Sequence, residues 1–389
     1  MKDILTLACA LLAVPMAARP QLETGRLAIN SKYSIVVPQS IGYNSFEGFR
    51  LGVGVSYEGE PWQWNAYVRH GFNDHRWKFG GHATRRLDTD GRLRATAWAQ
   101  STVAATGSLH LYEPDASLLG AMTVSVMDVD RSGGLRLAVD ATRSTAATVG
   151  VRVSDVEPVV SYRFALTDSV APDFRETAAT VGIRQSLTFI SAGSAVAVEA
   201  SHAEGRYSGH RRFGYSRYIC DIDVSTPELC TTLLAHRAGV HICAAAAEGS
   251  VPATRLYSAL GFRKKVGIET DNTFATMRHT EFAASRMLNA FFSYRVMVSP
   301  FNIAYEPRYW PMCIPSVTLL AKVGWADAPA GFRSYGRGFS EVGFVVNVFP
   351  YVTRGGLGVG FHRRIGHYRS GKGADNRAFC INVRLPMGP

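Results

Sequence analysis

Apolar and polar side chains alternate strictly between Gly48 and Gly71, and this alternation constrains the fold more than any other feature of the chain. In residues 49–57 the odd positions are apolar or aromatic, and the even positions are Arg, Gly or Ser. After Glu58–Pro61 the pattern resumes with the apolar residues at even positions. A period of two is typical of a β-strand with two unlike faces. The segment therefore predicts two strands whose faces meet different solvents.

The same alternation recurs along almost the whole chain of 389 residues. Clear examples are 160–167, 180–184, 288–298, 316–325 and 379–385; weaker ones lie near 92–99, 107–112, 120–127, 135–140, 147–154, 194–201, 238–244, 254–262, 339–348 and 356–363. Turn residues such as Asp88–Gly91 and Asp130–Gly134 separate these segments. No helical period and no change of composition marks a second domain. We therefore expect one all-β domain over residues 19–389, with roughly 14–18 strands.

The composition of the two faces distinguishes between the all-β architectures. The polar positions carry Gly, Ser, Thr, Asn and scattered Arg, whereas a sheet that faces water usually carries many Lys and Glu. The apolar positions carry aromatic residues near the expected strand ends: Tyr57, Trp62, Trp64, Tyr162, Tyr294 and Trp325. A lipid-facing band bordered by aromatic girdles predicts this placement. Closing the sheet into a barrel also removes its edge strands, whose unpaired backbone N–H and C=O groups could form no hydrogen bonds in hydrocarbon. We predict a closed antiparallel transmembrane β-barrel rather than a soluble sandwich or a propeller.

In this pattern, over residues 30–385, the chain resembles the outer-membrane β-barrel proteins of double-membraned bacteria and is porin-like in size. It departs from them at its end, Met387-Gly388-Pro389, where such barrels commonly carry an aromatic residue. The resemblance implies a location in the outer membrane, with its lipid as a partner. The apolar run Ile4–Met16, followed by two alanines, predicts a signal peptide over residues 1–18.

In such a barrel the polar positions of each strand face the interior, or lumen, so the alternation predicts which side chains line it. These are mostly basic, with two clear acids: Arg50, Arg69, Arg94, Arg136, Arg152, Arg163, Arg184, Arg295, Lys322, Glu199 and Glu341. The formal net charge of the chain is +11. An excess of arginine along a pore favours anions. The alternative is that these arginines pair with carboxylates and only neutralise the interior.

Three long outer loops are expected, at about 203–236, 326–338 and 363–377. The first contains a basic and aromatic group that could bind a host surface ligand, such as a glycan, or a lipid headgroup: Arg211, Arg212, Tyr215, Arg217 and Tyr218. The alternative is a basic loop that packs over the barrel mouth. Cys220 and Cys230 in the same segment have a spacing compatible with a loop disulfide in an oxidising compartment.

The sequence shows no catalytic or cofactor motif. His70, His75 and His82 lie close together without a nucleophile or an acid dyad, and Gly356–Gly360 has the wrong spacing for a dinucleotide fingerprint. We expect no enzymatic activity, no cofactor, no metal site and no nucleic-acid partner, and the sequence indicates no oligomeric state.

The sequence thus predicts a channel for the passive passage of small solutes that are anionic or amphipathic. Two alternatives stay open. One is a surface-exposed adhesin or host-ligand-binding barrel, and the other is a transporter of hydrophobic ligands of the fatty-acid type.

Overall fold

The computed structural model describes most of the chain after residue 25: residues 26–36, 41–44, 46–107, 127–159, 161–162, 164–166, 170–191, 193–231, 234–258, 267–269, 273–278, 280–298, 313–350, 356–368 and 376–384. These residues form one 20-stranded sheet and a separate two-stranded sheet. The described residues also include a 3-10 helix, η2 (Ala253–Arg255). In the described part of the chain, no helix is long and apolar enough to cross a membrane. The predicted signal peptide and the C-terminal Met387-Gly388-Pro389 lie outside the described residues.

The large sheet is built mainly from long strands that follow one another in sequence. They are β4 (Gly48–Glu58), β5 (Trp62–Gly71), β6 (Trp77–Arg86), β7 (Leu93–Ala105), β8 (Met127–Asp140), β9 (Thr145–Glu157), β10 (Phe174–Ser186), β11 (Ala195–Tyr207), β12 (Arg212–Ser225), β14 (Leu234–Gly249), β18 (Arg286–Val298), β19 (Cys313–Asp327), β20 (Phe339–Pro350), β21 (Gly356–Ile365) and β22 (Arg377–Arg384). Short strands complete the fold: β1 (Arg26–Ala28), β2 (Tyr33–Val36), β3 (Ile41–Asn44), β13 (Leu229–Cys230), β16 (Gly267–Glu269), β15 (Tyr257–Ser258) and β17 (Ala283–Ala284). The short pieces raise the strand number above the predicted range.

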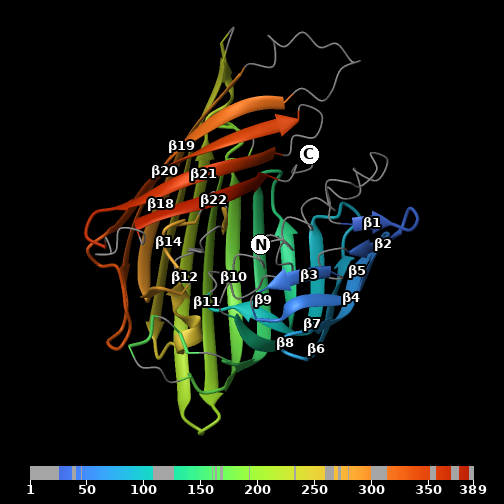
Figure 1. Cartoon of the computed structure of the whole chain (residues 1–389). Coiled ribbons are helices and arrows are strands. Elements are labelled where there is room, and N and C mark those ends of the chain that lie inside the picture. The colour runs from blue at the N-terminus through green and yellow to red at the C-terminus, as the bar shows by residue number, and fades with distance from the viewer. Residues whose placement is uncertain are drawn as a thin grey trace.

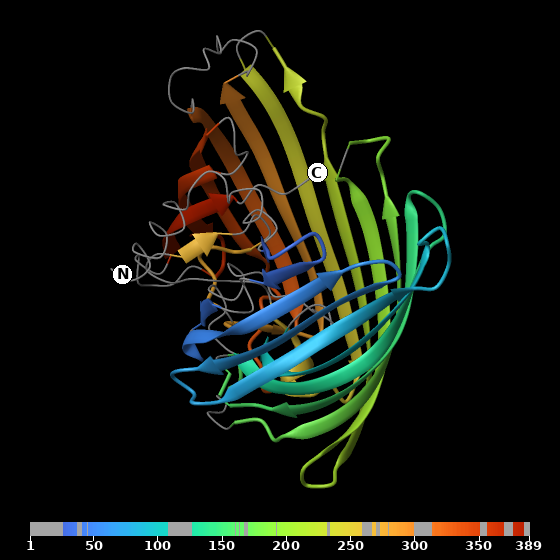
Figure 2. The same cartoon turned by 90° about the vertical axis from the view of Figure 1, so that its right-hand side faces the viewer.

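Each long strand pairs antiparallel with the next one, from β4 through β12, β14 and β18 to β22. Strands β2 and β3 both pair with β4, and β16 pairs with β22 in parallel. Figure 1 shows the sheet curling round, with β19–β22 crossing in front of the long central strands, and Figure 2 shows the same curvature from the side. The predicted antiparallel all-β fold is confirmed. Among the described strands, no pairing joins β22 to β2 or β3, so closure stays a prediction.

The two faces of the sheet differ as the alternation predicts. Apolar side chains on one face are exposed, for example Leu135 (65%), Val151 (50%) and Val359 (65%). Charged and polar side chains on the opposite, inner face are buried, for example Arg152 and Lys322. This is the reverse of a water-soluble sheet, and it is the arrangement of a barrel wall in lipid.

The two ends of the sheet differ in their connections. One end, the turn end, carries the short connections 59–61, 87–92 and 141–144 and the C-terminal end of β22. The other end, the loop end, carries the longer connections 158–173, 250–285 and 328–338. In the described part of the chain, the segments that pack inside come from the loop end.

Three sequence predictions are wrong. Residues 203–236 are not an outer loop, because Arg212–Ser225 form β12, which pairs with β11 and β14. The described part of 160–167 is not a strand but an irregular segment that packs inside. The weaker segment 254–262 begins with η2 and the two-residue β15 instead of a wall strand. In the last two cases the alternation alone could not distinguish wall from interior, and in the first the charged residues of a wall strand resemble those of a loop.

The assignment of faces can be tested with an added charge. We expect Val151→Arg, in the outer face of β9, to lower the free energy of unfolding in a bilayer by about 2–4 kcal/mol, because the guanidinium enters hydrocarbon. Gln100→Arg, on the inner face of β7, should cost clearly less. Urea-induced unfolding in lipid vesicles, followed by tryptophan fluorescence, measures both. Equal losses would contradict the assignment.

Candidate functional site: an occupied lumen

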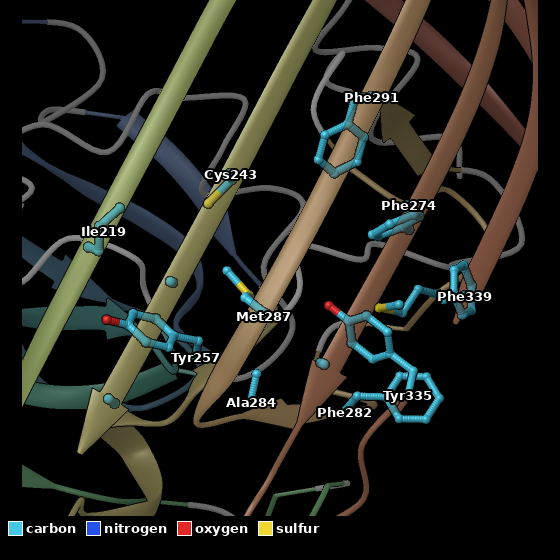
Figure 3. Close-up of a cluster of buried hydrophobic side chains, with 14 residues drawn as sticks. Ile219, Cys243, Tyr257, Phe274, Phe282, Ala284, Met287, Phe291, Tyr335 and Phe339 are labelled. Carbon is cyan, nitrogen blue, oxygen red and sulfur yellow. The ribbon is translucent and has the colours of Figure 1, made fainter. Parts of the chain in front are cut away.

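The interior at the loop end is filled by the chain's own connections. Tyr257, Phe274 and Met277, from the segment 250–285, and Tyr335, from 328–338, are fully buried. They form one apolar cluster with side chains of the wall: Ile219, Cys243, Met287, Phe291 and Phe339. Figure 3 shows these wall side chains projecting from neighbouring strands toward the inserted segments. We call the described residues of this connection, 250–258, 267–269, 273–278 and 280–285, the inner segment.

Aromatic contacts fix the inner segment to strands β18 and β20. The ring centroid of Phe274 lies 5.0 Å from that of Phe291 and 4.9 Å from that of Phe339. Phe282 packs on Tyr335 with centroids 5.4 Å apart. The Tyr335 hydroxyl donates to Asn289 Oδ1 at 2.9 Å, and burial raises the pKa of this phenol, so the hydroxyl stays protonated. Edge-on aromatic contacts add to the free energy gained from burial.

A buried carboxylate, Glu341 of β20, holds the backbone of the inner segment. Its oxygens accept hydrogen bonds from the backbone N–H groups of Ala275 (3.0 Å) and Thr276 (2.7 Å) and from the Thr276 hydroxyl (2.6 Å). Lys322 Nζ lies 3.3 Å from the same carboxylate and donates to the carbonyl of Thr273 at 2.6 Å. His362 Nδ1 also lies 3.3 Å from it. A buried charge requires this number of partners, because water cannot solvate it.

Arg364 of β21 provides a second attachment next to the first. Its guanidinium donates to Glu281 of the inner segment at 3.2–3.3 Å and to the backbone carbonyl of Thr276. The guanidinium carbon also lies 4.7 Å from the centre of the Phe339 ring. Lys322, Glu341, His362 and Arg364 thus form a polar group, which we call the wall latch, that binds residues 273–281.

The other half of the inner segment is attached to strands β8–β12. Arg255 of η2 donates to Glu176 of β10 at 2.8 Å, and the Tyr215 hydroxyl donates to the second oxygen of Glu176 at 2.7 Å. Tyr257 lies under the guanidinium of Arg217, 4.4 Å from ring centre to carbon. The inner segment therefore contacts opposite parts of the wall.

The remaining part of the inner wall is also charge-paired. Glu47, in the turn before β4, lies 3.1 Å from both Arg50 and Lys78, and Lys78 lies 2.5 Å from Asp74. Burial raises the pKa of Glu47, but the charges of Arg69, Arg50 and Lys78 outweigh this effect and lower it overall. The carboxylate therefore stays ionised inside the wall.

The predicted lumen residues fall on the inner face wherever the structure describes them. Four are paired with carboxylates: Arg50 with Glu47, Arg94 with Asp140, Arg152 with Asp130, and Lys322 with Glu341. Arg69 donates to the Thr102 hydroxyl at 2.5 Å. On β8, β10, β11 and β18, the alternate positions that face inward also include Arg136, Arg184, Glu199 and Arg295. Arg163 lies outside the described residues.

The predicted girdle residues divide into two groups. On the outer face, Tyr57 stacks on Trp64 with ring centroids 5.9 Å apart, and Trp62, Tyr294 and Trp325 are exposed. Tyr162 was expected in this girdle, and that prediction is wrong. It is buried inside, where its hydroxyl donates to Asp128 at 2.8 Å. Burial and the neighbouring carboxylate raise its pKa.

The predicted loop-binding residues do not form one surface. Arg212, Tyr215, Arg217 and Tyr218 all belong to β12, where successive side chains point to opposite faces. Tyr215 and Arg217 are buried inside, whereas Arg212 and Tyr218 are exposed outside, and Arg211 is exposed in the turn before β12. The expected ligand site on a long loop is therefore absent from this strand.

Cys220 and Cys230 are both free thiols. Cys220 lies five residues before the end of β12, opposite Ala244, and Cys230 lies beyond that end in β13. An extended strand rises about 3.4 Å per residue, so five residues of β12 alone separate the two Cα atoms by more than about 10 Å. A disulfide usually requires a Cα–Cα distance of about 4.4–6.8 Å. The predicted disulfide is wrong because the segment is a strand and not a loop.

Sequence reasoning missed the residues that hold the inner segment, notably Arg255, Glu176, Arg364 and His362. The alternation alone predicts an inward-facing side chain at Glu176, His362 and Arg364, because each stands at an alternate position on the inner face of its strand. Arg255 carries no such signal, because the sequence gives no indication that its segment folds inward. Among the described residues, no group of three or more His, Cys, Asp or Glu side chains could hold a metal ion.

Comparison with known proteins identifies the fold. No family model and no curated protein matches the sequence. A structure of BamA from Haemophilus ducreyi lacking POTRA domains 1–3 matches with a TM-score of 0.51 at 13% identity, over 87% of this chain and 68% of that chain. CdiB from Acinetobacter baumannii matches with a TM-score of 0.49 at 13% identity, over 92% of this chain. This chain spans 61% of the CdiB chain. Its fold resembles that of outer-membrane β-barrel proteins.

The wall latch can be tested at Glu341. Glu341→Gln keeps the shape of the side chain but removes the charge that balances Lys322. We expect the free energy of unfolding to fall by about 3–5 kcal/mol, because a buried cation loses its partner. We also expect faster trypsin cleavage after Arg278, because residues 273–281 lose their attachment. Glu204→Gln, on the outer face with a side chain 81% exposed, is the control and should change neither quantity.

Proposed function

We propose that this protein is an outer-membrane β-barrel that forms a gated passage, with the inner segment as its gate. The observation that carries the proposal is the packing of residues 273–284 against the inner wall, where Phe274, Met277 and Ala284 are fully buried. An open pore would leave the inner wall in water. Here the loop end of the interior contains an apolar core instead.

The transported solute is proposed to be small, with an anionic group and an apolar part. Displacement of the inner segment would uncover apolar wall side chains such as Met287, Phe291 and Phe339. It would also release Lys322 and Arg364 from their contacts with that segment. A passage with apolar and basic walls side by side suits an amphipathic anion. The pairing of Arg50, Arg94 and Arg152 with carboxylates argues against strong selection by these arginines alone.

The same geometry weakens the adhesin alternative. That alternative depended on a long outer loop at 203–236, and most of these residues are wall strands. A transporter of hydrophobic ligands stays open as a second candidate, because the cluster around Phe274 would give such a ligand an apolar surface once the segment moves.

Conductance in a planar bilayer tests the gate. We expect the refolded wild-type protein to show no stable conductance under a salt gradient. The double variant E341Q/R364Q should show discrete conductance steps, because both attachments of residues 273–281 are weakened. Glu204→Gln serves as the control and should stay closed. A shift in electrophoretic mobility on heating confirms first that each variant is a folded barrel.

Two outcomes would contradict the gate. One is a steady, porin-like conductance of the wild-type protein. The other is a silent double variant in which trypsin cleaves readily after Arg278, because the segment would then be released without opening a passage.

A further inference from the structure

Two arginines face each other on the outer surface of β21 and β22 at the loop end. Arg363 lies directly opposite Arg377 in the antiparallel register, and both side chains are exposed. Directly opposite residues have Cβ atoms about 4.5–5.5 Å apart, and like charges at this separation destabilise the pair. An anion between the two guanidinium groups would remove this repulsion.

An aromatic row borders these arginines on the side of the membrane. Phe361 and Phe379 lie two residues farther along the same strands, with ring centroids 5.1 Å apart, and Phe344 continues the row on β20 at 6.2 Å. Two residues correspond to about 7 Å along a strand. The outer face then continues with Val346 and Val359. The arginine pair therefore lies at the boundary of the apolar band.

The arginine pair lacks a compensating carboxylate in the part of the chain that the structure describes. Two other outer-face arginines at the same end have one: Arg131 lies 3.1 Å from Glu157, and Arg175 lies 3.5 Å from Asp155. A second opposed pair, Arg206 and Arg212 of β11 and β12, has no such ion pair among the described residues either, and it lacks the bordering aromatic row. No such ion pair involves Arg363 or Arg377 among the described residues. The charges of the two guanidinium groups are therefore not balanced by a carboxylate of the described residues.

We propose that Arg363 and Arg377 bind the phosphate of an anionic lipid headgroup, with the acyl chains of that lipid on Phe344, Phe361 and Phe379. Guanidinium groups match phosphate oxygens in charge and in hydrogen-bond geometry. Their long stems let the charged ends reach the headgroup layer while the methylene groups stay on apolar surface. The inference rests on the proposed function only in placing this face in a membrane.

The test is lipid retention by the full-length protein. The chain is reconstituted in nanodiscs of equimolar phosphatidylglycerol and phosphatidylcholine, and the lipids that stay bound are identified by native mass spectrometry. We expect the wild-type protein to retain phosphatidylglycerol over phosphatidylcholine by about tenfold, given two arginines at the surface. R363Q/R377Q should return this ratio to near one. Arg131→Gln, which removes an arginine that already has a carboxylate partner, should leave the ratio unchanged.

The outcomes separate this inference from the proposed function. A wild-type ratio near one, or a double variant that keeps the preference, overturns the lipid site while the barrel stands. A chain that does not enter nanodiscs, and shows no mobility shift on heating, overturns both. If R363Q/R377Q does not fold, the single variants R363Q and R377Q carry the test, and each should lower the ratio about threefold.

Discussion

The buried carboxylate of Glu341 is the contact on which the arrangement of the interior depends. It joins three parts of the chain that are far apart in sequence: β20, Lys322 of β19, and the backbone of Ala275 and Thr276. An ion inside the wall is stable only when every partner is present. The position of the inner segment is therefore coupled to the register of strands β19–β21.

This coupling explains why a sheet with a polar inner face can also cover an apolar core. The wall near β4–β10 satisfies its charges locally, through pairs such as Glu47 with Arg50 and Arg152 with Asp130. The wall near β18–β20 instead turns Met287, Phe291 and Phe339 inward, where only other apolar side chains can cover them. The inner segment provides that cover. The inner segment is thus held by the wall latch, by the apolar cluster and by the contact of Arg255 with Glu176, and its strand β16 also pairs with β22.

The outer face of the sheet follows a separate physical rule, because its apolar side chains are exposed. Exposed Val, Leu and Phe side chains form its middle, while Tyr57, Trp64 and the pair Arg363–Arg377 lie near the strand ends. Aromatic rings and arginine stems are stable where hydrocarbon gives way to headgroups. The charge at the loop end is therefore suited to contact with lipid as well as with water.

The sequence by itself determined the all-β fold and the assignment of faces, because a period of two puts each side chain on a fixed side of a strand. This local rule placed Arg50, Arg152, Lys322 and Glu341 on the inner face before any tertiary structure was considered. It failed where a segment packs inside the wall and where a wall strand carries many charged residues. Tyr162 alternates like a girdle residue but packs inside, and Arg212–Ser225 looked like a loop because of its arginines and aspartates. Only the tertiary structure decided that residues 253–257 and 273–278 pack inside, since that depends on contacts with strands distant in sequence, such as those of Arg255 with Glu176 and of Thr276 with Glu341.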